Sequence, residues 1–287
     1  MKRIVLGCLL LLIVGCADNK SSNLKQEWKS GKDNLSIPES AIYDKRGDVI
    51  YVSNVNSIKS SNPWADNSGF ISKLDKSGKV IKLKWAIGLK APKGLAIYKN
   101  HLFASDLNQV VEIDTTSGKI LNKFLAPTGI NRLNDIACRE EKEICFVSDS
   151  GTKKLFEVSL KSGKFKLIYD KEKSPKAEQN GLFINNNNLI MQGEVGELKS
   201  LNLDTKKVTI LSHNVNFAID GVTKYRDKGY IVSTWSGGIY FIDKSGDIKK
   251  ILGDKFNTAD IFYSKELDLL LVPDFAHNII GYKIKDM

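Results

Sequence analysis

Histidine is scarce in this sequence, with only three residues among 287. They are His101, His213 and His277, and they lie far apart along the chain. The sequence contains no Ser-His-Asp arrangement, no phosphate-binding glycine loop and no spacing of zinc ligands. A surface role suffices for His101 and His277, so any chemistry in this chain has to rest on other side chains.

Long hydrophobic runs are also lacking. The one marked apolar stretch, residues 4–14, is shorter than the roughly 20 residues that a membrane-spanning helix needs. It follows Lys2 and Arg3 and ends before Gly15 and Cys16, an order that is typical of a signal peptide. We therefore predict that residues 1–15 are a signal peptide and that the protein is exported.

The residues Ile13, Val14, Gly15 and Cys16 resemble a bacterial lipobox. This resemblance implies that the Cys16 sulfur takes a diacylglycerol and that the chain is cut just before it. The alternative is an ordinary signal peptide with a cysteine there by chance. We predict a lipoprotein held to the periplasmic or cell-surface side of a membrane, with residues 16–35 as lipidated cysteine and tether.

No basic block is present, although the net charge is +10. The lysines are scattered through turns such as residues 75–79 and 161–164. Scattered charge is typical of a solvated surface, whereas nucleic-acid binding calls for a basic patch or helix. We expect no nucleic-acid partner, and the sequence does not indicate an oligomeric state.

Cysteine is limited to four residues, of which Cys8 and Cys16 belong to the predicted export signal. The spacing of the other two, Cys138 and Cys145, suits facing positions across a β-hairpin, within reach of a disulfide. An oxidising compartment permits that bond. The alternative is a pair of buried thiols, and a metal site is not expected because no histidine is near.

Six segments of the remaining chain repeat one pattern of strands. Each opens with a short strand, continues into an apolar strand that ends in a polar residue, and closes with two strands around a turn rich in Asp, Lys, Ser and Gly. The openings lie 39 to 54 residues apart and begin at Glu39, Lys93, Asn134, Asn180, Asp220 and Ala259. Four-stranded units of about 40 to 45 residues are the repeat of β-propellers.

The repeat predicts an all-β fold, a six-bladed β-propeller of four-stranded antiparallel blades over residues 36–287. The last repeat has only three strands, and residues 24–29 can supply its outer strand. That pairing joins the two ends of the chain and covers an otherwise open sheet edge. A β-sandwich of similar strand count is the competing architecture.

In a propeller the first strand of each blade lines the central channel, so the six opening residues should meet at one mouth. Four of them carry oxygen ligands of the kind that a hard cation such as Ca²⁺ prefers. The ends of the second strands form an outer ring at the same face, and for most of these residues we expect a turn-starting role. They are Asn54, Asp106, Asp149, Glu194, Thr234 and Asp274.

Four short motifs contain these opening residues. They are Pro38 and Glu39, then Arg132 to Asp135, then Asn180 to Leu182, then Asp220 and Gly221. In order and spacing they resemble the regucalcin/gluconolactonase family (senescence marker protein-like) of six-bladed propellers. The resemblance implies that Glu39, Asn180 and Asp220 hold a divalent metal, Ca²⁺ in first place and otherwise Zn²⁺, Mg²⁺ or Mn²⁺. It further implies that Arg132 and Asn134 contact substrate and that Asp220 is the catalytic base.

The activity implied is hydrolysis of a small-molecule lactone or related ester, with the metal polarising the carbonyl. Lys93 departs from the pattern, because it places an ammonium group at one of the opening positions, next to the predicted substrate pocket. A salt bridge from Lys93 to Glu39 or Asp220 would take the place of the metal and leave a structural site. The alternative function is therefore a non-catalytic propeller that binds a ligand or a protein.

Overall fold

The structure is a computed structural model that describes residues 23–31, 35–56, 67–170, 179–194, 196–213, 215, 218–253, 256–285 and 287. The predicted signal peptide and Cys16 lie outside the described residues.

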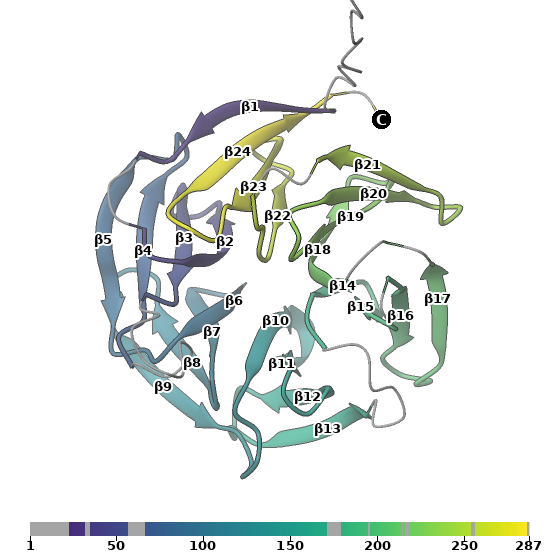
Figure 1. Ribbon diagram of the computed structural model, residues 1–287. Coiled ribbons are helices and arrows are strands. Elements are labelled where there is room, and N and C mark those ends of the chain that lie inside the picture. Colours follow the sequence, from purple (N-terminus) through teal and green to yellow (C-terminus); the bar gives the residue numbers. More distant parts are fainter. Residues whose placement is uncertain are drawn as a thin grey trace, which may run out of the picture.

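Six four-stranded antiparallel sheets are arranged around a central axis, which confirms the predicted six-bladed propeller (Figure 1). Blades 1 and 2 consist of β2 (Pro38–Asp44), β3 (Val49–Asn54), β4 (Phe70–Asp75) and β5 (Val80–Ile87), then β6 (Pro92–Tyr98), β7 (His101–Asp106), β8 (Gln109–Asp114) and β9 (Ile120–Leu125). Blades 3 and 4 consist of β10 (Leu133–Arg139), β11 (Ile144–Asp149), β12 (Lys154–Ser159) and β13 (Phe165–Asp170), then β14 (Leu182–Asn185), β15 (Asn188–Gln192), β16 (Leu198–Asn202) and β17 (Val208–Ser212). Blades 5 and 6 consist of β18 (Ile219–Tyr225), β19 (Gly229–Thr234), β20 (Ile239–Asp243) and β21 (Ile248–Leu252), then β22 (Phe262–Ser264), β23 (Leu269–Pro273), β24 (Ile279–Ile284) and β1 (Leu24–Lys29).

The sequence of each strand matches its depth in the blade. Second strands such as β3 and β23 are apolar runs that are buried along their whole length, because another blade packs on each face. Outer strands such as β5 and β9 are largely exposed. The hydrophobic core lies between blades, as where Tyr51 and Trp85 of blade 1 pack with Leu102 and Val111 of blade 2.

Blade 6 closes the ring with strands from both ends of the chain, as predicted for residues 24–29. Strand β1 pairs antiparallel with β24, with Leu24 opposite Ile284 and Lys29 opposite Ile280. The Trp28 ring lies over Gly281, where an added Cβ would come within 2.4 Å of Trp28 Cε2. Glycine is thus required at residue 281 for the closing strand to lie flat against its neighbour.

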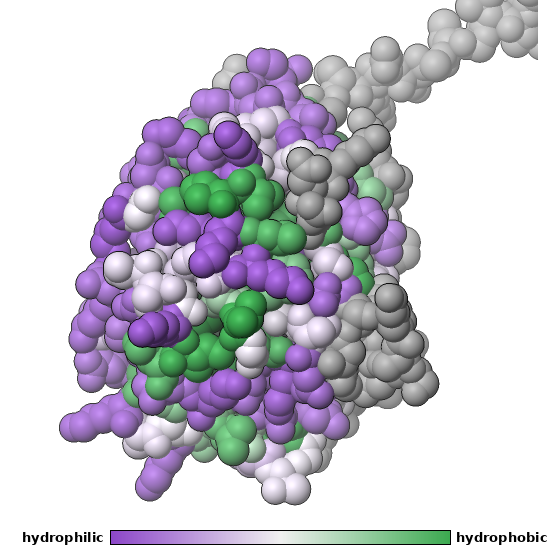
Figure 2. Space-filling model, turned by 90° about the vertical axis from the view of Figure 1, so that its left-hand side faces the viewer, coloured by the Kyte–Doolittle hydropathy of each residue, from purple (hydrophilic) through white to green (hydrophobic). Residues whose placement is uncertain are grey.

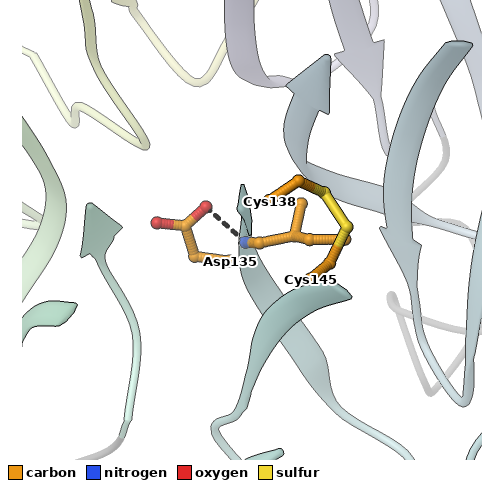
Figure 3. Close-up of a disulfide and its surroundings, with 4 residues drawn as sticks. Asp135, Cys138 and Cys145 are labelled. Atoms are coloured by element: carbon orange, nitrogen blue, oxygen red, sulfur yellow. Dashed lines mark hydrogen bonds between the residues drawn. A yellow bond between two sulfur atoms is a disulfide. The ribbon is translucent and has the colours of Figure 1, made fainter. Parts of the chain in front are cut away.

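The predicted Cys138–Cys145 disulfide is present and joins β10 to β11 (Figure 3). The two residues face each other in the hairpin register, with their Cα atoms 3.9 Å apart. The hairpin turns through a 3-10 helix, Glu140–Lys142, and through Glu143 in the left-handed conformation.

The side of the ring around the outer strand β5 is mostly hydrophilic, with separate hydrophobic patches between the charged side chains (Figure 2). Exposed apolar residues such as Ile81 and Ile87 belong to the outer strand β5. Within the described part of the chain, no helix has the length and apolar character needed to cross a membrane.

Candidate functional site

The predicted site residues meet in one cavity of about 370 Å³ at a mouth of the central channel. Five of the six opening residues line it, and Arg132 lines it as well. The sixth, Ala259, is buried and is not part of the lining. The predicted residues in the lining are Glu39, Lys93, Arg132, Asn134, Asn180 and Asp220.

Irregular pairing at the start of the innermost strands turns these residues out of the sheets. In β2, β6, β10 and β18 the ladder shifts register at the opening residue. Such bulges redirect side chains and are common next to functional sites. Serines of the second strands complete the disrupted ladder: Ser53 accepts from the Ser40 amide at 3.0 Å and Ser233 from the Gly221 amide at 2.8 Å.

Glu39 and Lys93 form a buried ion pair on one side of the cavity. The Lys93 ammonium donates to Glu39 Oε1 at 2.5 Å. This is the contact on which the non-catalytic alternative rests. The second carboxylate oxygen, Oε2, is buried, and no hydrogen-bond donor within the described chain reaches it.

Asn180 and Asp220 form a second pair. Asn180 Nδ2 donates to Asp220 Oδ1 at 2.7 Å, which leaves Asn180 Oδ1 buried and without a donor among the residues described. Burial raises the pKa of Asp220 well above its ordinary value, and the charge of Glu39 raises it further, while Lys93 acts in the opposite direction. A bound cation would favour the ionised form of this carboxyl group.

Blades 3 and 4 contribute further polar side chains to the lining. Asn134 Nδ2 donates to Ser150 Oγ at 2.8 Å, and Ser150 Oγ donates to the Gln179 carbonyl at 2.8 Å. Gln192 also lines the cavity. Ser150 and Gln192 were not predicted, because the first directly follows a strand end and the second belongs to the least regular repeat.

A second ring of residues, one position further along each opening, lies beneath the cavity. Asp135 accepts from the amides of Ile136, at 2.6 Å, and of Leu182 in blade 4, at 2.5 Å. Asp260 accepts from Ser40 Oγ in blade 1 at 2.7 Å. Burial raises the pKa of Asp135 to about 8.

Glycines in the neighbouring blades make room for these two carboxylates. A Cβ at residue 94 would lie 2.5 Å from Asp135 Oδ1, and a Cβ at residue 221 would lie 2.7 Å from Asp260 Oδ1. Figure 3 shows the Asp135 carboxylate directed away from the disulfide. Sequence reasoning missed this ring, although an Asp or Gly directly after five of the six opening residues is a visible signal.

In the outer ring of strand-end residues, several side chains accept hydrogen bonds from loop amides and so have a structural role, as predicted for most of these residues. Asp106 accepts from the amides of Lys90 and Ala91. Asp149 and Asp274 accept from amides of the turns that follow them. These bonds fix the loops that surround the cavity.

Histidine takes no part in the cavity, since none of the three lines it. His101 Nδ1 lies 2.5 Å from Glu112 Oε1. Among the residues that the structure describes, no group of three or more His, Cys, Asp or Glu side chains is arranged to hold a metal ion. A cation site here would therefore rest on two carboxylates and an amide.

No family model matches this chain, and no curated protein matches it by sequence. By structure it is similar to a chain in a crystal structure of a nidogen/laminin complex, with a TM-score of 0.63 and 12% sequence identity. The match covers 79% of this chain and 85% of that one. At this identity the similarity shows the propeller fold alone, and the resemblance to the regucalcin/gluconolactonase family stays a prediction.

Proposed function

We propose that the cavity is the active site of a divalent-cation-dependent lactone hydrolase. The observation that supports this most is the pair of unfilled acceptors, Glu39 Oε2 and Asn180 Oδ1, on residues that line one cavity with Asp220. A buried acceptor without a partner costs about 1–3 kcal/mol. Two of them in one cavity fit a site that is completed by a bound cation.

Glu39, Asn180 and Asp220 would hold the cation, because carboxylate and amide oxygens suit Ca²⁺. The chemistry that such a cation supplies is polarisation of the lactone carbonyl and stabilisation of the oxyanion. The Asp220 carboxylate accepts a proton from the attacking water, and Asn180 Nδ2 fixes its orientation through the 2.7 Å hydrogen bond. Arg132 and Asn134 orient the substrate from blade 3.

A second candidate is a non-catalytic propeller that binds a small ligand or a protein. The 2.5 Å ion pair favours it, because the Lys93 ammonium already compensates the charge of Glu39. A protein partner, as in the nidogen/laminin complex to which the fold is similar, is one form of this candidate.

The deciding experiment is the melting temperature of the protein in EDTA and then in excess Ca²⁺, Mg²⁺, Mn²⁺ or Zn²⁺. A cation at 100 times its Kd stabilises the folded state by about 2.7 kcal/mol. We expect this shift with one cation, and we expect Asp220→Ala to abolish it. Asp204→Asn, at an exposed carboxylate outside the cavity, is the matched control. No shift with any cation would favour the second candidate.

Hydrolysis is tested with a panel of lactones in the presence of that cation. Loss of the general base in Asp220→Asn should lower kcat by at least about a hundredfold. Arg132→Met should raise KM more than it lowers kcat, since Arg132 is proposed to orient the substrate. Equal activity of wild type and Asp220→Asn would contradict the mechanism.

The lipid anchor is a separate proposal that rests on the sequence around Cys16. Metabolic labelling with palmitate should mark the wild-type protein and not Cys16→Ser. Labelling of Cys16→Ser, or no labelling of the wild type, would contradict it.

A further inference from the structure

The lining of the cavity combines polar and apolar side chains. Blades 3 and 4 contribute polar side chains only. The apolar part of the lining comes from blades 2 and 5 and consists of Leu107, Ala218, Ile219 and Trp235. Blades 1, 2 and 5 also supply Glu39, Lys93 and Asp220, so a ligand that fills the cavity meets hydrogen-bonding groups and hydrocarbon together.

The apolar part of the lining continues behind the cavity through blades 6 and 1. Trp235 is 43% exposed, and its ring packs edge-on against Phe275 with a centroid distance of 4.4 Å. Leu107 and Phe275 in turn pack against a buried cluster that includes Val55. We call Leu107, Ile219, Trp235 and Phe275 the apolar wall.

Two members of the apolar wall occupy backbone positions that do not favour them. Leu107 has φ of 58° and Phe275 has φ of 49°, in the left-handed region where glycine and asparagine are preferred. Each directly follows the last polar residue of a second strand, Asp106 or Asp274. Bulky apolar residues are thus placed at equivalent turn positions against the local preference, as is typical of functional sites.

The cavity volume fits a small molecule and is too small for a folded partner. A polyhydroxylated sugar lactone that fills the cavity would bring some of its hydroxyl groups against the side chains of Leu107 and Ile219, which cannot form hydrogen bonds. A lactone with one apolar substituent would place its ring among the polar side chains and the substituent on the Trp235 ring. Burial of that substituent would add affinity in proportion to its length.

We propose that the substrate is a lactone bearing an alkyl or acyl substituent, and that the apolar wall determines this specificity. The inference rests on the proposed lactone hydrolysis but concerns a different part of the cavity. Trp235 and Leu107 are specificity-determining residues in this scheme and take no part in the chemistry.

Binding is tested with 5-methyl-, 5-butyl- and 5-octyl-2-pyrrolidinone, which are lactams that resist hydrolysis and match alkyl γ-lactones in shape. Calorimetric titration of the wild-type protein should show Kd falling by up to roughly fourfold for each buried methylene, and by at least tenfold from methyl to butyl. A Kd that does not depend on chain length overturns the proposal.

Two variants test the apolar wall. Trp235→Ala and Leu107→Asn should both abolish the dependence of Kd on chain length. Leu107→Asn trades the packing of a half-buried leucine for a residue that tolerates the left-handed backbone, so its melting temperature, measured alongside, separates lost binding from unfolding. Leu125→Asn, at a leucine that is 65% exposed on the outer strand β9, is the matched control and should behave as wild type. Retention of the chain-length dependence in both wall variants overturns the proposal.

The two proposals fail in different ways. Lactone hydrolysis with a kcat/KM that is indifferent to chain length would overturn the apolar wall and leave the hydrolase. Chain-length-dependent lactam binding without hydrolysis of any lactone would overturn the hydrolase and leave an amphipathic ligand site with the same wall.

Discussion

Two rings of side chains cross the central channel one residue apart in sequence, and they differ in how completely their polar atoms are bonded. The opening ring, at the cavity, contains Glu39 and Asn180, each with a buried oxygen that no donor in the described chain reaches. In the second ring, beneath the cavity, both Asp135 oxygens accept amide hydrogens and Asp260 accepts from Ser40. Carboxylates of both rings are buried, so burial alone does not separate a binding role from a structural one.

Residues that are neighbours in the chain therefore have different roles, one structural and one suited to binding. Asp135 and Asp260 join blades, since their partners lie in the adjacent blades 4 and 1. Glu39 and Asn180 retain acceptors for a ligand. Unfilled hydrogen-bonding capacity, more than charge or depth, therefore marks the candidate site.

The largest expected effect comes from Lys93 in the opening ring. Lys93→Met leaves Glu39 as an unpaired buried carboxylate and should lower the free energy of unfolding in EDTA by about 3–5 kcal/mol. Ca²⁺ should recover part of this loss, because a cation can replace the ammonium beside Glu39. Urea unfolding with and without Ca²⁺ measures both. Lys76→Met, which breaks an exposed ion pair with Asp48, is the control and should cost less than about 1 kcal/mol.

A similar loss of unfolding free energy that no cation recovers would show that Lys93 has a structural role like the second ring, and would contradict the difference between the two rings.

Gly94, the next residue, belongs to the second ring and should respond differently. In Gly94→Ala the new Cβ would meet Asp135 Oδ1 at 2.5 Å and Asp135 Cα at 2.7 Å, which forces two innermost strands apart. We expect a loss of about 3 kcal/mol that Ca²⁺ does not recover. Gly253→Ala, where nothing lies within 4 Å of the added Cβ, should stay near wild type. Recovery of Gly94→Ala by a cation would contradict the division into two rings.

The disulfide lies at the end of the β10–β11 hairpin that is away from the cavity, so it tests whether the two rings depend on this hairpin. Reduction, or the double variant Cys138→Ser with Cys145→Ala, should lower the free energy of unfolding by about 2–3 kcal/mol. The affinity for a cation should not change, because Asn134 and the cavity lie at the opposite end of β10. Thermal melts with and without reductant, each repeated with Ca²⁺, measure this. A changed cation affinity in the reduced protein would show that the rings depend on the hairpin.

The most gradual effect is the titration of the second ring. The pKa of Asp135 is raised to about 8 by burial, so the folded state keeps a proton that the unfolded chain releases near pH 4. Stability should therefore fall as pH rises from 5 to 8, by up to about 1.4 kcal/mol per pH unit, and level off above. Urea unfolding in EDTA at a series of pH values measures the slope. Asp135→Asn should start less stable and show a shallower slope, whereas a wild-type stability that rises over this range would contradict the assignment.

The sequence predicted those parts of the fold and site that repeat. Glu39, Lys93, Asn134, Asn180 and Asp220 occupy one position of a period, so their meeting at the channel follows from the propeller itself. The pairing of residues 24–29 with the last repeat followed from counting its strands, and the disulfide followed from hairpin spacing.

What the sequence did not reveal depends on side-chain contacts between blades. Asp260 was passed over because Ala259 occupies the opening position of its repeat. The role of the glycines around Asp135 and Asp260 is visible only when the neighbouring strands are seen in contact. Trp235 directly follows a strand end, as Val55, Leu107 and Phe275 do in their repeats, so this apolar position was visible in the sequence and was overlooked. The Lys93–Glu39 ion pair was foreseen only as an alternative, since the repeat fixes which residues meet and not which atoms bond.

The pairing of β1 with β24 also has a consequence for how the chain folds. The contact between Leu24 and Ile284 closes a loop of about 260 residues, which by loop-closure entropy costs about 3 kcal/mol more than closing a loop of eight. Formation of blades 1 to 5 brings the two ends close together and removes most of that cost. We therefore expect β1, although it precedes the other propeller strands in the sequence, to be among the last to find its place, after every residue of the cavity has already been positioned.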